Sequence, residues 1–97
     1  MEIDQRDLRS ITEAVQSKLG RTAVYYEAGQ EEIVTIDDCF VDPSWGVHAT
    51  VKKAATSLSG GSELGDRWHI SAAWEYFSIS EREWYSSSVG GWRMRFI

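Results

Sequence analysis

The sequence predicts an α+β fold in which one N-terminal α-helix packs on an antiparallel β-meander of five or six strands. Apolar residues recur every three or four positions up to residue 20, and from residue 22 onward they alternate with polar ones. Short clusters rich in glycine, serine or proline separate the alternating segments. The 97 residues are enough for a single domain, with the helix over about 5–19 and the β-sheet over about 22–97.

The first segment, DQRDLRSITEAVQSKLG, has the spacing of an amphipathic helix. The residues expected to face the sheet are Leu8, Ile11, Val15 and Leu19. Asp4 stands where an N-cap belongs, and Ile3 before it is placed to contact the first turn as a hydrophobic staple. Gly20 suits the position just after the last helical turn.

The next segments have the period of β-strands. TAVYYEA and EEIVTIDD flank the turn signal AGQ, which predicts a hairpin of about 22–28 and 31–38. FVDPSWG contains the only proline and is expected to be a connection. WGVHATVKKA alternates cleanly and predicts a half-buried strand. Its inward set is Trp45, Val47, Ala49 and Val51, and its outward set is His48, Thr50 and Lys52.

A polar loop is expected at 56–66, between two strands that pair across it. The aromatic stretch RWHISAAWEYFSIS fits a helix or a strand, and its alternation favours a strand. One β-bulge near Glu75–Tyr76 would keep Phe77 and Ile79 on the face of Trp68, and this would be the central strand, facing the helix.

The C-terminal segments predict a last hairpin. SERE at 80–83 fits either a turn or a capping box with a single helical turn. Beyond it, WYSSSV and WRMRFI flank a Gly-Gly turn, with Trp92, Met94 and Phe96 alternating with Arg93 and Arg95. The order of elements is similar to a cystatin-like arrangement, in which a curved sheet grips a helix, and this likeness implies no function.

Charge gives the clearest information about partners. The net charge is −5, and residues 1–48 hold ten acidic side chains against four basic ones, a net of −6. Six carboxylates and no Lys or Arg lie between residues 27 and 42. Such a field repels nucleic acid and anionic membranes and attracts basic surfaces. We therefore expect a protein partner with a basic surface, no direct nucleic acid binding and no membrane, and the oligomeric state is left open.

Cysteine content and hydropathy bear on the compartment. The single cysteine, Cys39, cannot form an intramolecular disulfide, and we expect it to be structural. The N-terminus has no basic region followed by an apolar run, and no stretch approaches the ~18 apolar residues of a membrane helix. These features predict a cytoplasmic protein.

Two side-chain groups are candidates for chemistry. Asp37, Asp38 and Asp42 lack the spacing and central glycine of a calcium loop, so no metal and no cofactor is expected. His48 and His69 are expected to come together on neighbouring strands. With Glu75 they could serve acid–base work or bind a ligand in an aromatic pocket, although no nucleophile motif accompanies them.

The sequence favours a non-enzymatic protein-binding module, most simply a small acidic inhibitor. Immunity proteins, antitoxins and phage-encoded antagonists such as an anti-CRISPR fit this description, since their targets carry basic surfaces for nucleic acid. The residues predicted to bind the partner are Glu27, Glu31, Glu32, Asp37, Asp38, Asp42 and Trp45. The alternatives are a small-ligand-binding domain or enzyme that uses His48, His69 and Glu75, and a structural or assembly subunit.

Overall fold

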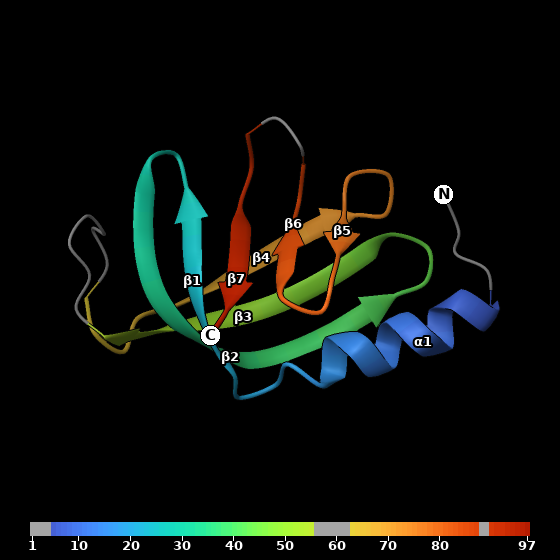
Figure 1. Ribbon diagram of the computed structural model, residues 1–97, viewed down its shortest axis with the longest axis horizontal. Coiled ribbons are helices and arrows are strands. Elements are labelled where there is room, and N and C mark those ends of the chain that lie inside the picture. Colours follow the sequence, from blue (N-terminus) through green and yellow to red (C-terminus); the bar gives the residue numbers. More distant parts are fainter. Residues whose placement is uncertain (1–4, 56–62, 88–89) are drawn as a thin grey trace.

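The computed structural model describes residues 5–55, 63–87 and 90–97, and it consists of one helix and a curled antiparallel sheet (Figure 1). The elements are α1 (Gln5–Gln16), β1 (Thr22–Glu27), β2 (Gln30–Asp42), β3 (Gly46–Ala55), β4 (Arg67–Ala73), β5 (Ser78–Ile79), β6 (Glu83–Tyr85) and β7 (Arg93–Phe96). The α+β class is confirmed. The sheet has seven strands rather than five or six, because residues 78–96 form three short strands.

The first and last strands of the chain are neighbours inside the sheet, and β4 and β5 form its two edges. The strand order is β4-β3-β2-β1-β7-β6-β5, and every pair is antiparallel. Each strand therefore pairs with the next one in the chain, except that β4 does not pair with β5, and β7 pairs with β1. Residues 74–77 join the two edge strands. In Figure 1, β4 crosses behind β1 and β7, as this curling requires.

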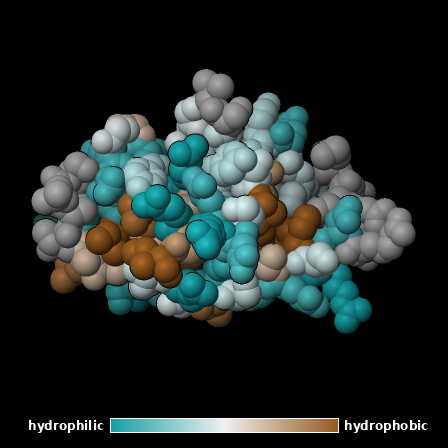
Figure 2. Space-filling view, viewed as in Figure 1, coloured by the Kyte–Doolittle hydropathy of each residue, from teal (hydrophilic) through white to brown (hydrophobic). Residues whose placement is uncertain are grey.

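The concave side of the sheet holds the core. Fully or almost fully buried side chains are Val15, Ala23, Val34, Ile36, Val47, Val51, Ile70, Ala72, Trp84 and Met94. Each of the larger ones contributes about 1.5–3 kcal/mol of hydrophobic free energy relative to an exposed position. On the side of the molecule seen in Figure 2, hydrophilic residues cover most of the surface, and hydrophobic ones reach it in separate groups.

Helix α1 lies along β2 (Figure 1). The Gln16 side-chain amide donates to the Cys39 carbonyl at 2.8 Å, and the Cys39 thiol donates to the Val15 carbonyl at 3.4 Å. Val15 is fully buried, and Ile11 packs against the core, as predicted. Leu19 was predicted to face the sheet, and that prediction is wrong, because its side chain is 50% exposed.

The position of Leu19 follows from the end of the helix. Helix α1 stops at Gln16, and the Leu19 amide then donates to the Gln16 carbonyl in a tighter turn, which rotates its side chain away from the helical face. Gly20 has φ +79°, the left-handed conformation expected just after a helix. The predicted cap at Asp4 and staple at Ile3 lie outside the described residues.

The predicted β1–β2 hairpin is confirmed. Its loop is Ala28–Gly29, and both residues have positive φ (49° and 79°), as a type I′ turn requires. Strand β2 continues to Asp42 and includes an irregularity between Ile36 and Asp38. The connection predicted at FVDPSWG is therefore shorter than expected, and only residues 43–45 form the turn to β3.

The aromatic stretch begins as a strand, as predicted. Strand β4 pairs with β3, and Ile70 and Ala72 point into the core. The strand ends at Ala73, whose carbonyl accepts from the amides of Tyr76 and Phe77 at 3.0 and 2.9 Å. The predicted bulge is thus replaced by a turn, and β4 is an edge strand rather than the central one. Most of the predicted 56–66 loop lies outside the described residues.

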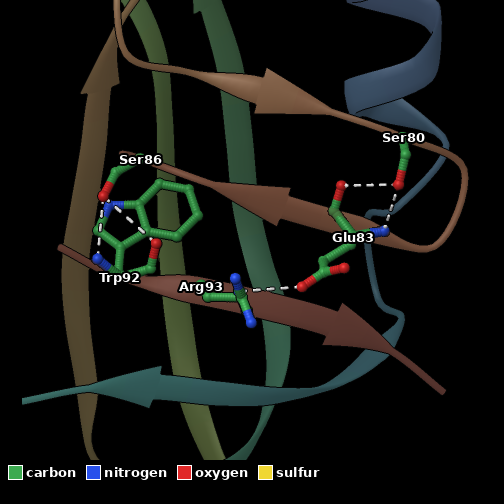
Figure 3. Close-up of polar contacts among 5 residues, drawn as sticks. All are labelled: Ser80, Glu83, Ser86, Trp92 and Arg93. Atoms are coloured by element: carbon green, nitrogen blue, oxygen red, sulfur yellow. Dashed lines mark hydrogen bonds and ion pairs between the residues drawn. The ribbon is translucent and has the colours of Figure 1, made fainter. Parts of the chain in front are cut away.

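The C-terminal hairpins are drawn in Figure 3. Ser80 and Glu83 form a turn between β5 and β6, in which the Ser80 amide donates to the Glu83 carbonyl at 2.8 Å and the Glu83 amide donates to Ser80 Oγ at 3.1 Å. The Arg93 guanidinium pairs with the Glu83 carboxylate at 3.0 Å. The predicted alternation of β7 is confirmed, since Met94 is buried and Arg93 is exposed.

Candidate functional site

The predicted partner-binding residues do not form one surface. Glu27 and Glu31 lie at the β1–β2 hairpin tip, whereas Asp42 and Trp45 lie at the other end of β2. A strand rises ~3.3 Å per residue, so about 35 Å of chain separates Glu31 from Asp42. The acidic segment therefore supplies two separate surfaces, one at the hairpin tip and one at the other end of β2.

Glu32 is not at the surface at all. Its residue is only 4% exposed, and its carboxylate accepts a hydrogen bond from the Lys53 ammonium at 3.1 Å. Glu32 is in phase with Val34 and Ile36, which point into the core. That alternation was visible in the sequence and could have separated Glu32 from the exposed Glu31. Glu32 is therefore a buried structural residue and is not part of the binding surface.

Asp37 is exposed but already engaged by a cation. It lies at the irregularity of β2, and its carboxylate accepts from the Arg67 guanidinium of β4 at 2.8 Å. Ion pairs this exposed contribute about 0–1 kcal/mol to stability. The main consequence of this ion pair is that the positive charge of Arg67 offsets the negative charge of Asp37 at the surface.

The outer face of β2, β3 and β4 carries a cluster of exposed aromatic and imidazole rings. We call it the ring face and define it by Phe40, Trp45, His48 and His69. The irregularity in β2 turns Phe40 outward, opposite His48 of β3. The Phe40 and His48 rings are stacked, with centroids 4.6 Å apart and planes within 8°. Trp45, in the turn before β3, contacts the same imidazole, with 4.9 Å between the ring centroids.

These rings are accessible. Phe40 is 50% exposed and Trp45 is 43% exposed. The other large hydrophobic residues that are exposed in the described parts of the chain are Leu19, Leu64, Tyr76 and Ile97. Among these six described residues, Phe40 and Trp45 are the two that contact one shared ring, that of His48. The ring face is therefore a cluster rather than a single exposed side chain.

The two histidines meet on this face, as the sequence predicted. His48 Nδ1 lies 3.1 Å from His69 Nε2, and the ring centroids are 5.2 Å apart. Burial against its neighbours and the charge of His69 hold the pKa of His48 below its usual range, whereas the Asp42 carboxylate acts in the opposite direction. Asp42 is thus close enough to His48 to belong to the rim of the ring face.

Asp38 completes this rim. It precedes Phe40 by two residues on β2, so both side chains point outward, and its register partner is Thr50, which is also opposite His69. Asp38 Oδ1 accepts a hydrogen bond from the Cys39 amide at 2.9 Å. Asp42 Oδ1 accepts from the Ser44 amide at 2.9 Å. Each carboxylate is therefore held in place by the backbone beside it.

The alternative site predicted around His48, His69 and Glu75 differs from this geometry. The two histidines point away from the core, and Glu75 is exposed in the turn after β4. Within residues 5–55, 63–87 and 90–97, no three His, Cys, Asp or Glu side chains are grouped as metal ligands. The described residues place the histidine pair on an open surface rather than inside an aromatic pocket.

Cys39 is a structural residue, as predicted. It is 2% exposed, and burial together with the Asp38 carboxylate raises the pKa of its thiol to about 11. A thiol in this environment is a poor nucleophile at neutral pH. Its contact with the Val15 carbonyl serves to join α1 to β2.

Phe40 is the site residue that sequence reasoning missed. The nearby Pro43 and Gly46 predict a connection at Phe40, whereas the structure extends β2 through it. The outward position of Phe40 depends on the irregularity near Asp37, and an irregularity inside a strand leaves little trace in a single sequence.

Comparison with protein families, with curated proteins and with solved structures finds no match for this chain. The similarity to a cystatin-like arrangement therefore stays a prediction from the order of elements. No helix among the described residues has the length and apolar character needed to cross a membrane.

Proposed function

We propose that this protein is a non-enzymatic binding module, an inhibitor that covers a basic surface of a protein target with its ring face. The observation that carries the proposal is the exposed stack of Phe40, His48 and Trp45, bordered by Asp38 and Asp42. Aromatic side chains are enriched at the centres of protein interfaces, where they often dominate the binding energy.

The chemistry of this surface suits arginine. A guanidinium group over an aromatic ring gains about 0.5–1 kcal/mol at an exposed site and about 2 kcal/mol when water is excluded. The same group forms paired hydrogen bonds with a carboxylate, which Asp38 and Asp42 offer beside the rings. Rings and carboxylates occur together here, whereas the hairpin tip with Glu27 and Glu31 offers carboxylates as its main feature.

The net charge supports the same kind of partner. A charge of −5 accelerates encounter with a basic surface and makes association sensitive to salt. Glu27 and Glu31 contribute to this long-range attraction from the far end of β2. Proteins that handle nucleic acid carry basic grooves, so the proposal includes the class predicted from sequence, that of immunity proteins, antitoxins and phage-encoded antagonists such as an anti-CRISPR, acting in the cytoplasm.

The test compares two pairs of charge-neutralising substitutions. Asp38→Asn with Asp42→Asn removes two charges from the ring face and keeps the oxygens that accept from Cys39 and Ser44. Glu27→Gln with Glu31→Gln removes two charges from the hairpin tip. Affinity for a fluorescent poly-arginine peptide should fall about tenfold or more in the first variant, the equivalent of about 1.4 kcal/mol, and clearly less in the second. An equal or larger loss in the hairpin variant contradicts the proposal.

A further inference from the structure

We propose that protonation of the His48–His69 pair controls whether the ring face binds its partner, and we call this control the gate. This inference rests on the proposed function. The face accepts an arginine-rich partner near neutral pH and releases it below about pH 6, the range in which histidines charge. The proposal follows from the geometry of the pair, from its contact with both exposed rings and from the charges around it.

The geometry limits how many protons the pair can hold. A hydrogen bond between His48 Nδ1 and His69 Nε2 at 3.1 Å needs one nitrogen to donate and the other to offer its lone pair. This condition is met when both rings are neutral and when one ring is protonated. When both are protonated, two N–H groups face each other with no acceptor between them, and two positive charges repel. The second proton must therefore separate the rings.

Separation of the pair would change the whole ring face, because His48 is its central ring. Phe40 stacks on the His48 imidazole, and Trp45 contacts the same imidazole. A movement of His48 away from His69 thus alters the support of both exposed aromatic side chains. Protonation has a second effect in the same direction, since a positive charge beside Asp42 competes with an incoming guanidinium.

The charges facing the pair come from three strands. Strand β2 contributes Asp38 and Asp42, and the Asp42 carboxylate favours protonation of His48. Strand β3 contributes Lys52, and β4 contributes Arg67, which is paired with Asp37. For His48, burial and the charge of His69 outweigh the Asp42 carboxylate, so its pKa lies below the usual value.

The direction of the effect follows from these charges. Two interacting groups take up their protons in two separate steps, and the second step falls at the lower pH. Of the side-chain types on the ring face, histidine is the one that ordinarily changes its charge between about pH 5 and about pH 8. A loss of binding between about pH 7.5 and about pH 5.5 would therefore come from the histidines and not from the carboxylates.

The experiment measures the dissociation constant of a fluorescent poly-arginine peptide at about pH 7.5 and about pH 5.5, at constant ionic strength. For the unmodified protein it should rise about tenfold or more at the lower pH. His69→Gln keeps a hydrogen-bonding side chain that does not titrate, and His69→Phe keeps a ring. In both variants the ratio of the dissociation constants at the two pH values should approach one, whatever the affinity at the higher pH. Glu81→Gln, in the β5–β6 turn, should behave like the unmodified protein.

A second readout needs no ligand. The histidine ring resonances, followed by NMR over the same pH range, should titrate in two separate steps, and His69→Gln should raise the pKa of His48. Circular dichroism at both pH values shows whether the fold is retained. Equal binding at both pH values, or a full pH dependence in His69→Gln, contradicts the gate alone. Absence of binding at both pH values contradicts the docking function and, with it, the gate.

Discussion

The carboxylate of Glu32 lies 3.1 Å from the ammonium group of Lys53, and both side chains are almost completely shielded from solvent. The pair joins β2 to β3 within the curled sheet. Glu32 is in phase with Val34, and Lys53 is in phase with Val51, so both enter the interior by strict alternation. Burial of two charges costs several kcal/mol per ion, and only their mutual attraction and hydrogen bonding offset this cost.

Removal of one partner should therefore destabilise the protein strongly. Glu32→Ala leaves the Lys53 charge buried without its carboxylate, and the free energy of unfolding should fall by about 3–5 kcal/mol. Urea denaturation followed by tryptophan fluorescence measures this change. The double variant Glu32→Leu with Lys53→Met replaces both charges by apolar groups and should be much closer to the unmodified protein. A double variant as unstable as the single one would show that the ion pair itself is required.

Gly46 should tolerate no side chain. A Cβ atom at this position would collide with the backbone carbonyl of Ala72 in β4, and neither strand can shift alone, because the two are paired along their length. Gly46→Ala should lower the free energy of unfolding by about 3 kcal/mol or more, because the collision is with backbone rather than with a flexible side chain. Gly20→Ala is the control, since open space surrounds Gly20 and only its φ of +79° adds about 1–2 kcal/mol. Equal losses in the two variants would contradict the close approach of β3 and β4.

The thiol of Cys39 should be unreactive in the folded protein. With a pKa of about 11, its thiolate fraction at pH 8 is on the order of a hundredfold below that of a free cysteine, and burial slows reagents further. Labelling by a disulfide reagent should be slow in buffer and fast in urea. Because folding raises this pKa, stability should also decrease as pH rises from about 8.5 toward 11. Rapid labelling without denaturant would show that α1 does not cover Cys39 as described.

The exposed rings should matter for binding and little for stability. Phe40→Ala and Trp45→Ala remove side chains that are about half exposed, so each should change the free energy of unfolding far less than a core substitution does. Each should weaken poly-arginine binding about tenfold or more if the ring face is the contact. Leu64→Ala is the matched control, because Leu64 is 68% exposed and lies outside the ring face. A similar loss of affinity in all three variants would contradict a specific role for the rings.

Local patterns predicted most of the elements. The spacing of Ile11 and Val15 indicated α1, Ala28–Gly29 indicated a hairpin, and the alternation through Val47 and Val51 indicated β3. Each of these signals is complete within a few residues, so no knowledge of distant contacts was needed. The prediction that Leu19 faces the sheet failed because the helix ends about one turn earlier than its apolar spacing suggests.

Long-range pairing could not be read in the same way. The pairing of β1 with β7 joins the C-terminal strands to the rest of the sheet, and it brings together residues such as Ala23 and Phe96 that share no local signal. The chain also turns after Ala73 to pass from β4 at one edge of the sheet to β5 at the other, and no local pattern indicates this passage. The outward position of Phe40 depends on the irregularity in β2. The histidines and Trp45 of the ring face could therefore be predicted from the sequence, whereas Phe40 could not.

The central claim is that the protein binds a cationic partner through the ring face rather than through the acidic hairpin tip. Titration of isotopically labelled protein with a poly-arginine peptide at neutral pH, followed by backbone amide NMR, tests it most directly. The largest shift changes should fall on residues 38–48 and on His69, with small changes at residues 27–31. Changes concentrated at residues 27–31, or none at the ring face at saturating peptide, would contradict the account.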